Sequence, residues 1–94
     1  MRISKEKREK ISEQVLAYLF SINPKPAFTS YIAREVARDE EFIKRLLQYM
    51  KSKNFVVEVK KNPKGSDYLR RIRWKLTEAT YTLYRNLQDT KNSF

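Results

Sequence analysis

The sequence predicts one α+β domain that is mostly helical, and three observations carry this prediction. Apolar residues recur every three or four positions in three segments before Asn54, alternate with polar residues from Phe55 to Leu76, and return to helical spacing after Thr77. Only 94 residues are present, and a chain of this length supports a single hydrophobic core. Apolar residues make up 40% of the chain, which is enough to fill that core.

The first predicted helix spans residues 4–21. Its apolar residues Ile11, Val15 and Leu19 are four positions apart and therefore share one face of a helix. Lysine and arginine crowd the first turns, so we expect residues 1–9 to form a basic arm that extends beyond the core.

A connector and a short second helix follow. Two prolines lie within Asn23–Pro26, and each disfavours helical backbone in the residue before it, so this segment is expected to be extended. Thr29 or Ser30 then supplies a side-chain oxygen that caps the second helix. This helix is expected to be short and to end near Ala37 or Arg38.

The third predicted helix runs from about Glu40 to Lys53. Asp39 is its expected N-cap, and Glu41 adds a further negative charge to the first turn, where the helix dipole favours anions. Asn54 stands where a residue of left-handed conformation commonly ends a helix. Because the second helix is expected to end just before Asp39, only a tight turn separates the second and third helices.

The sequence predicts a β-hairpin after the third helix. Its strands are residues 55–61 and 68–76, and the segment 62–67 between them is rich in turn-forming residues. Val57 and Val59 share one face of the first strand. In the return strand Ile72, Trp74 and Leu76 alternate with Arg71, Arg73 and Lys75, so the hairpin is expected to have one apolar and one basic face.

A fourth helix closes the predicted fold. Thr77 is its expected cap, and residues 78–88 form the helix. Leu83, Tyr84 and Leu87 lie on one side of it. We expect residues 89–94 to be a flexible polar tail.

Four motifs together carry a resemblance to a known fold. They are Ile32-Ala33-x-x-Val36 before the tight turn, Ile43-x-x-Leu46-Leu47-x-x-Met50 after it, Lys53-Asn54-Phe55-Val56 at the entry to the hairpin, and Trp74-x-Leu76-Thr77 at its exit. Over residues 32–77 the chain resembles a winged helix-turn-helix domain, with a two-stranded wing and an extra C-terminal helix. The last motif is similar to the MarR-like and PadR-like regulators, and the small size is similar to the stand-alone winged-helix proteins of archaea and their viruses.

Composition excludes several classes of function. The chain has no cysteine, no histidine and one glycine. Disulfides, thiolate metal sites, cysteine nucleophiles and glycine-rich phosphate loops are therefore excluded, and the commonest general base is absent. We expect no enzyme activity, no metal and no cofactor. No apolar run is long enough to span a membrane, and a cytoplasmic protein with no small-molecule ligand is expected.

Net charge indicates the partner. Lysine and arginine number 21 against 11 for aspartate and glutamate, which gives +10 and a basic isoelectric point. Such a surplus is typical of nucleic-acid-binding domains. An anionic membrane surface and a purely solubilising charge are the two alternatives.

The resemblance implies sequence-specific binding of double-stranded DNA and a role in transcription regulation. The third helix would enter the major groove, with flanking contacts from the second helix, and the basic wing would contact the backbone or minor groove. The candidate DNA-binding residues are Tyr31, Arg34, Lys44, Arg45, Gln48, Lys51, Lys60, Lys61, Lys64, Arg70, Arg71, Arg73 and Lys75. Glu40 and Glu41 either stabilise the helix start or accept a hydrogen bond from a cytosine amino group. Trp74 is expected in the core, with base stacking as the alternative.

A homodimer is expected, because readers of DNA operators are commonly two-fold dimers. The candidate dimer interface is Ile11, Val15, Leu83, Tyr84 and Leu87. Two other functions remain open. One is an RNA- or ribosome-associated winged helix, and the other is a protein-interaction adaptor, which the acidic start of the third helix favours and the surplus of positive charge disfavours.

Overall fold

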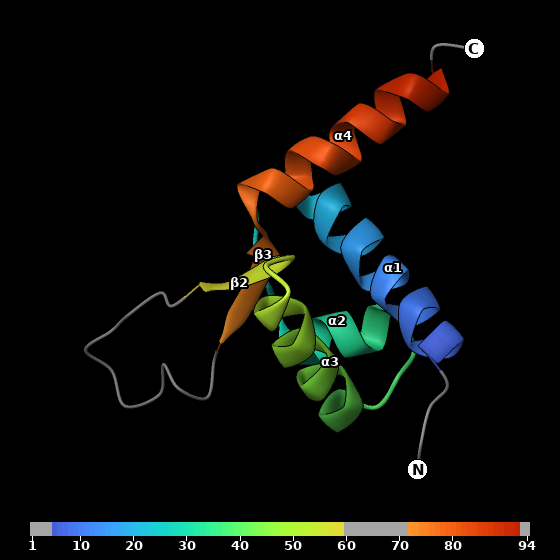
Figure 1. The fold of residues 1–94 in the computed structure, drawn as a ribbon. Coiled ribbons are helices and arrows are strands. Elements are labelled where there is room, and N and C mark those ends of the chain that lie inside the picture. The colour runs from blue at the N-terminus through green and yellow to red at the C-terminus, as the bar shows by residue number, and fades with distance from the viewer. Residues whose placement is uncertain (1–4, 60–71, 93–94) are drawn as a thin grey trace.

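The computed structural model describes residues 5–59 and 72–92, with side chains as far as residue 88 (Figure 1). Within these residues the elements are α1 (Lys5–Ile22), β1 (Ala27–Phe28), α2 (Thr29–Glu35), α3 (Glu40–Ser52), β2 (Val56–Val59), β3 (Arg73–Leu76) and α4 (Glu78–Asn92). The helices α1, α2 and α3 pack on one another and on the sheet, whereas α4 extends away from this body. The α+β class predicted from the sequence is confirmed.

The core lies between α1, α2, α3 and the inner face of the sheet. Helix α1 contributes the residues whose spacing predicted it, and β3 contributes Trp74 and Leu76. Trp74 is the largest fully buried side chain, with 1% of its surface exposed. The core members are Ile11, Val15, Leu19, Ala27, Ile32, Ala33, Ile43, Leu46, Leu47, Met50, Val56, Trp74 and Leu76.

The sheet has three strands among the described residues, in the order β1-β3-β2, and both pairs are antiparallel. The sequence predicted only the two strands of the hairpin. The segment after Pro26 forms the third strand, β1, in which Ala27 pairs with Trp74 and Phe28 pairs with Arg73. A strand of two residues has no measurable periodicity, so only its pairing with β3 reveals it.

Strand register corrects the predicted faces of the hairpin. Val56 pairs with Leu76 and is buried, so it lies on the inner face with the apolar residues of β3. Val57 pairs with Lys75 and is exposed. Val59 pairs with Arg73, so Val57 and Val59 both lie on the outer face of the sheet, together with the basic residues of β3. That outer face is therefore mixed in character and not purely basic.

Trp74 connects the sheet to α2. Its indole Nε1–H donates a hydrogen bond to the Thr29 hydroxyl at 2.9 Å, which pairs the one polar group of this buried side chain. The core position of Trp74 is thereby confirmed. The predicted cap of α2 is wrong, because Phe28 occupies the N-cap position and no side chain caps it. Thr29 is used instead as the partner of the indole.

Both ends of α3 are as the sequence predicts. The Asp39 carboxylate accepts a hydrogen bond from the Phe42 backbone N–H at 3.1 Å. At the other end Asn54 has a φ of 67°, and the Phe55 N–H donates to the Met50 carbonyl at 2.9 Å. This is the left-handed helix ending that asparagine tolerates. The turn before α3 uses a second left-handed residue, Ala37, with a φ of 56°.

Helix α4 begins at the predicted place but is longer than expected. The Thr77 hydroxyl accepts the Thr80 backbone N–H at 3.2 Å and donates to the Asn54 carbonyl at 3.1 Å, so the cap also joins α4 to the end of α3. The helix continues to Asn92, which corrects the predicted tail for residues 89–92, and residues 93–94 lie outside the described residues. Polar residues do not by themselves end a helix. Residues 89–92 include no proline or glycine that would end it.

Candidate nucleic-acid interface

Helix α3 presents a polar face on the side opposite its core contacts. Ile43, Leu46, Leu47 and Met50 are buried, and they form a single stripe along about two turns of the helix. The side chains on the opposite face are exposed: Lys44, Arg45 and Gln48. Two cations and an amide therefore lie together on one helix. Side chains of these types can contact the edges of guanine and adenine in a major groove.

Contacts on both flanks hold α3 in place. On one side Lys51 forms an ion pair with Glu58 of β2. On the other side the Arg8 guanidinium lies 4.6 Å from the centre of the Tyr49 ring, and Lys53 lies 5.7 Å from the same ring. Lys51, predicted from sequence to bind DNA, thus has an intramolecular partner, since its position on the helix turns it toward β2.

Of the basic arm predicted at residues 1–9, the structure describes Lys5 onward, where the side chains are exposed except that of Arg8. Residues from Lys5 onward are the first turns of α1. Arg8 is half-buried against Tyr49 of α3 and so belongs to the body of the domain. The spacing of apolar residues in α1 could not show this, because a cation packed on an aromatic ring leaves no apolar signal.

The acids at the start of α3 divide into two kinds. Asp39 is used locally, because its carboxylate caps the helix. Glu40 and Glu41 are exposed in the first turn, where they stabilise the positive end of the helix dipole. A contact between either glutamate and a cytosine stays a prediction.

Only part of the predicted wing falls within the described residues. Arg73 and Lys75 lie on the outer face of β3, opposite the core, as the alternation of the sequence predicts. The remaining wing residues predicted to bind DNA lie outside the described residues: Lys60, Lys61, Lys64, Arg70 and Arg71.

Two aromatic rings and two guanidinium groups meet where the outer face of the sheet adjoins α2. The Phe28 and Tyr31 rings are 5.5 Å apart and nearly perpendicular, at 86°. The Arg73 guanidinium lies 5.8 Å from the Phe28 ring, and that of Arg34 lies 5.7 Å from the Tyr31 ring. Tyr31 and Arg34 were predicted as DNA contacts, but Phe28 was not, because its place opposite Arg73 depends on the pairing of β1 with β3.

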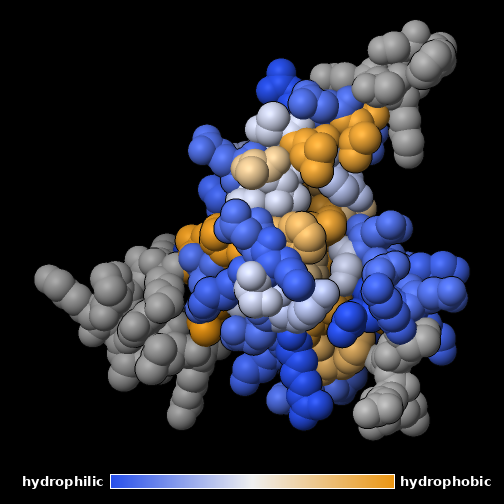
Figure 2. Space-filling model, viewed as in Figure 1, coloured by the Kyte–Doolittle hydropathy of each residue, from blue (hydrophilic) through white to orange (hydrophobic). Residues whose placement is uncertain are grey.

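An apolar strip runs along α4 (Figure 2). Leu83 and Leu87 are 61% and 53% exposed, which is unusual for leucines that share a helix face. Tyr84 is half-buried, and its ring lies 5.2 Å from that of Phe20 on α1.

The predicted contribution of α1 to a dimer interface is corrected by the structure. Ile11 and Val15 are 2% and 0% exposed and belong to the core of this domain. The apolar stripe that they form is covered by the sheet and by α3, because α1 packs on both. They are therefore unavailable to a partner, and of the candidate interface Leu83, Tyr84 and Leu87 remain accessible.

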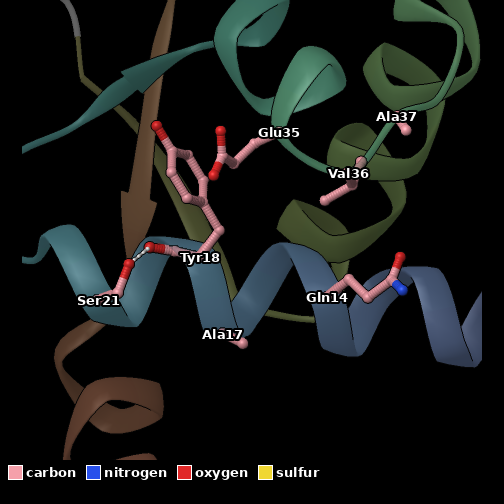
Figure 3. A pocket seen from close by; sticks show the side chains of 7 residues that line it. All are labelled: Gln14, Ala17, Tyr18, Ser21, Glu35, Val36 and Ala37. Atoms are coloured by element: carbon pink, nitrogen blue, oxygen red, sulfur yellow. Dashed lines mark hydrogen bonds between the residues drawn. The ribbon is translucent and has the colours of Figure 1, made fainter.

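A shallow hollow of about 430 Å³ lies between α1 and the end of α2 (Figure 3). Tyr18 extends from α1 toward Glu35 on α2, and the Ser21 hydroxyl donates to the Tyr18 carbonyl at 2.6 Å. Gln14 lines the hollow from the next turn of α1. No cluster of three potential metal ligands occurs within residues 5–59 and 72–92. The helices of these same segments include none that is long and apolar enough to cross a membrane.

Comparison with known proteins shows a likeness at the level of the fold. No family profile and no curated protein sequence matches the chain. The Zalpha domain of Carassius auratus PKZ, solved in complex with Z-DNA, superposes with a TM-score of 0.62 at 15% identity, over 76% of this chain and 98% of that one. S. aureus MepR in a DNA complex superposes with a TM-score of 0.69 at 19% identity, over 94% of this chain and 72% of that one.

A third similar structure is the MarR family transcriptional regulator SPO1453 from Silicibacter pomeroyi. Its TM-score is 0.63 at 19% identity, and the superposition covers 85% of this chain. The match takes in 52% of that regulator, so this chain spans about half of its length. Together with the order of helices and strands, these likenesses show that the chain has a winged helix-turn-helix fold.

Proposed function

We propose that this domain binds double-stranded DNA, with α3 as the helix that enters the major groove. The observation that carries the proposal is the exposed face of α3. Lys44, Arg45 and Gln48 lie together on the helix that follows the tight turn of a winged helix-turn-helix fold. In that fold the second helix of the turn is the one that reads base edges.

Charge and structural likeness support the same proposal. A net charge of +10 supplies the attraction to phosphates from which most non-specific affinity comes. Two of the similar structures, MepR and the Zalpha domain, were solved in complex with DNA and with Z-DNA. Regulation of transcription is the role we propose for such binding, with Arg73, Lys75 and the predicted wing residues on the backbone or minor groove. The proposal is one of binding and includes no catalytic step.

A salt titration tests this proposal. We expect the domain to bind duplex DNA, and log K to fall linearly with log salt by about 0.9 for each phosphate that it neutralises. Duplex RNA of the same sequence is the competitor for the RNA-binding alternative, since its deep, narrow major groove excludes a helix. A duplex held in the Z form is a third arm, because the matched Zalpha structure contains Z-DNA. If none of these three duplexes forms a salt-dependent complex, duplex binding is refuted, and the absence of single-strand binding as well would favour a protein adaptor.

We also propose that two copies pair through α4. Leu83 and Leu87 form an apolar strip that the described part of this chain leaves uncovered, and a dimer would place two copies of α3 on successive turns of DNA. Half-sites about 34–36 Å apart would then be bound together.

Introducing a charge into this strip is expected to separate the copies. Leu83→Asp should give a folded monomer whose affinity for a two-half-site operator is lost and whose weak binding remains. Sedimentation equilibrium with circular dichroism measures both properties. Thr82→Asp is the matched control, because Thr82 is exposed on the same helix but lies about 100° around it from Leu83, outside the apolar strip. A wild-type protein that is monomeric at tens of micromolar would contradict the dimer.

A further inference from the structure

The outer face of the sheet, where it adjoins α2, carries a group of aromatic and arginine side chains that lies apart from the exposed face of α3. We call this group the aromatic–arginine face, and it consists of Phe28 from β1, Tyr31 and Arg34 from α2, and Arg73 from β3. Each ring has a guanidinium within 6 Å of its centre: 5.8 Å for Phe28 with Arg73 and 5.7 Å for Tyr31 with Arg34. The consecutive elements β1 and α2, together with the distant strand β3, therefore place rings and cations side by side.

This face is not part of the core. Trp74 and Leu76 point inward from β3, whereas Arg73 points to the opposite side. Tyr31 is 51% exposed, which leaves half of a large aromatic side chain in solvent. Stability of the domain does not require a tyrosine at such a position, since the buried face of α2 is made by Ile32 and Ala33.

The charge around the face is positive. Register places Val57, Val59 and Lys75 beside Phe28 and Arg73 on the outer side of the sheet, and none of these described residues is acidic. Among the described residues of the three strands, no carboxylate therefore lies on this side to pair with the cations. An anionic ligand that also offers flat apolar surfaces would complement the face.

An unpaired strand of nucleic acid has both properties. Its bases stack on aromatic rings and on guanidinium planes, and its phosphates pair with the cations between them. Bases in a duplex are already stacked on one another, so a duplex cannot use an exposed ring in this way. We propose that the aromatic–arginine face binds single-stranded nucleic acid, with Tyr31 stacking on a base and Arg34 and Arg73 contacting phosphates.

The location of the face suits a nucleic acid that also contacts α3. Helix α2 packs against both α3 and β1, so the face adjoins the helix that we propose for the major groove. A strand that leaves a duplex bound by α3 would reach the face directly. The single-strand site does not depend on the duplex site, however, and the experiment separates the two.

The test measures binding of a fluorescein-labelled oligothymidine by anisotropy, with an oligouridine of equal length as the RNA arm. Tyr31→Ala is expected to weaken single-strand binding about fivefold or more, which corresponds to about 1 kcal/mol per lost stacked base. The slope of log K against log salt should stay unchanged, because no cation is removed. Arg34→Ala should instead make that slope shallower by about 0.7, the value for one phosphate of a single strand.

Three further variants complete the design. Tyr31→Phe keeps the ring and is expected to bind as the wild type does. Tyr31→Leu keeps an apolar side chain against Phe28 and so preserves the fold, but it should lose stacking as Tyr31→Ala does. Tyr49→Ala is the matched control, because Tyr49 is also an exposed tyrosine beside an arginine but lies on the far flank of α3.

Each result decides the inference. Wild-type affinity of Tyr31→Leu for the single strand would overturn it, as would equal losses in Tyr31→Ala and Tyr49→Ala. A wild-type protein that binds duplex DNA but no single strand would also overturn it and would leave the proposed duplex function standing. Single-strand binding that requires Tyr31, without duplex binding, would support this inference and refute the proposed function.

Discussion

Replacing Trp74 with alanine is expected to lower the free energy of unfolding by about 3–5 kcal/mol, the range for large aromatic side chains deleted from a core. Trp74 is the largest fully buried residue and is 1% exposed, so no solvent can replace its contacts. A domain of this size is stable by only about 5–15 kcal/mol, so the variant would lose a large fraction of its stability. Urea denaturation followed by far-ultraviolet circular dichroism measures the loss.

The hydrogen bond of Trp74 is tested separately. Thr29→Val removes the acceptor and leaves the buried indole N–H unpaired, which is expected to cost about 1–3 kcal/mol. Trp74→Phe removes the donor and keeps most of the volume, and combining it with Thr29→Val should cost less than the sum of the two single losses. Tyr49→Ala is the control for truncating an aromatic residue, because Tyr49 is 38% exposed. A loss in Trp74→Ala no greater than in Tyr49→Ala would contradict the core assignment.

Truncation of the α3 face is expected to have the largest effect on recognition. Arg45→Ala or Gln48→Ala should reduce the preference for a selected DNA sequence by about 1–3 kcal/mol, if the residue makes a bidentate contact with a base. Non-specific affinity should change much less, since most of it comes from phosphates. The measurement is the ratio of affinities for the selected and a scrambled duplex, after selection from a random pool.

Arg85→Ala is the matched control for this experiment. Arg85 is an exposed arginine on α4, which extends away from α3 (Figure 1), so its loss removes the same charge without touching the proposed reading face. The ratio of specific to non-specific affinity should be that of the wild type. If the α3 variants retain the wild-type ratio as well, then Arg45 and Gln48 do not read the sequence.

The sequence was sufficient for the parts of this molecule that depend on neighbours along the chain. Helix α3 is the clearest example: its apolar spacing, its Asp39 cap and its Asn54 ending are all local features, and the structure contains each of them. The alternation in β3 likewise placed Trp74 in the core and Arg73 on the other face. Local patterns therefore predicted the polar face proposed to meet DNA.

Features that depend on distant pairing could be found only in the tertiary structure. Two residues of β1 carry no periodic signal, yet their pairing with β3 places Phe28 opposite Arg73 and creates the aromatic–arginine face. The sequence also could not show whether Ile11 and Val15 belong to a dimer interface or to the core, because apolar residues suit both. The structure places both in the core.

The division has a single physical reason. Periodicity and capping report which way a side chain points relative to its own helix or strand, and these are determined by residues a few positions apart. Tertiary packing decides which other residues that side chain contacts. In this molecule the sheet and α3 cover the apolar face of α1, whereas Leu83 of α4 remains exposed to solvent. The sequence by itself therefore determined the elements and the polar face of α3, and the tertiary structure decided which apolar and aromatic surfaces remain available to a partner.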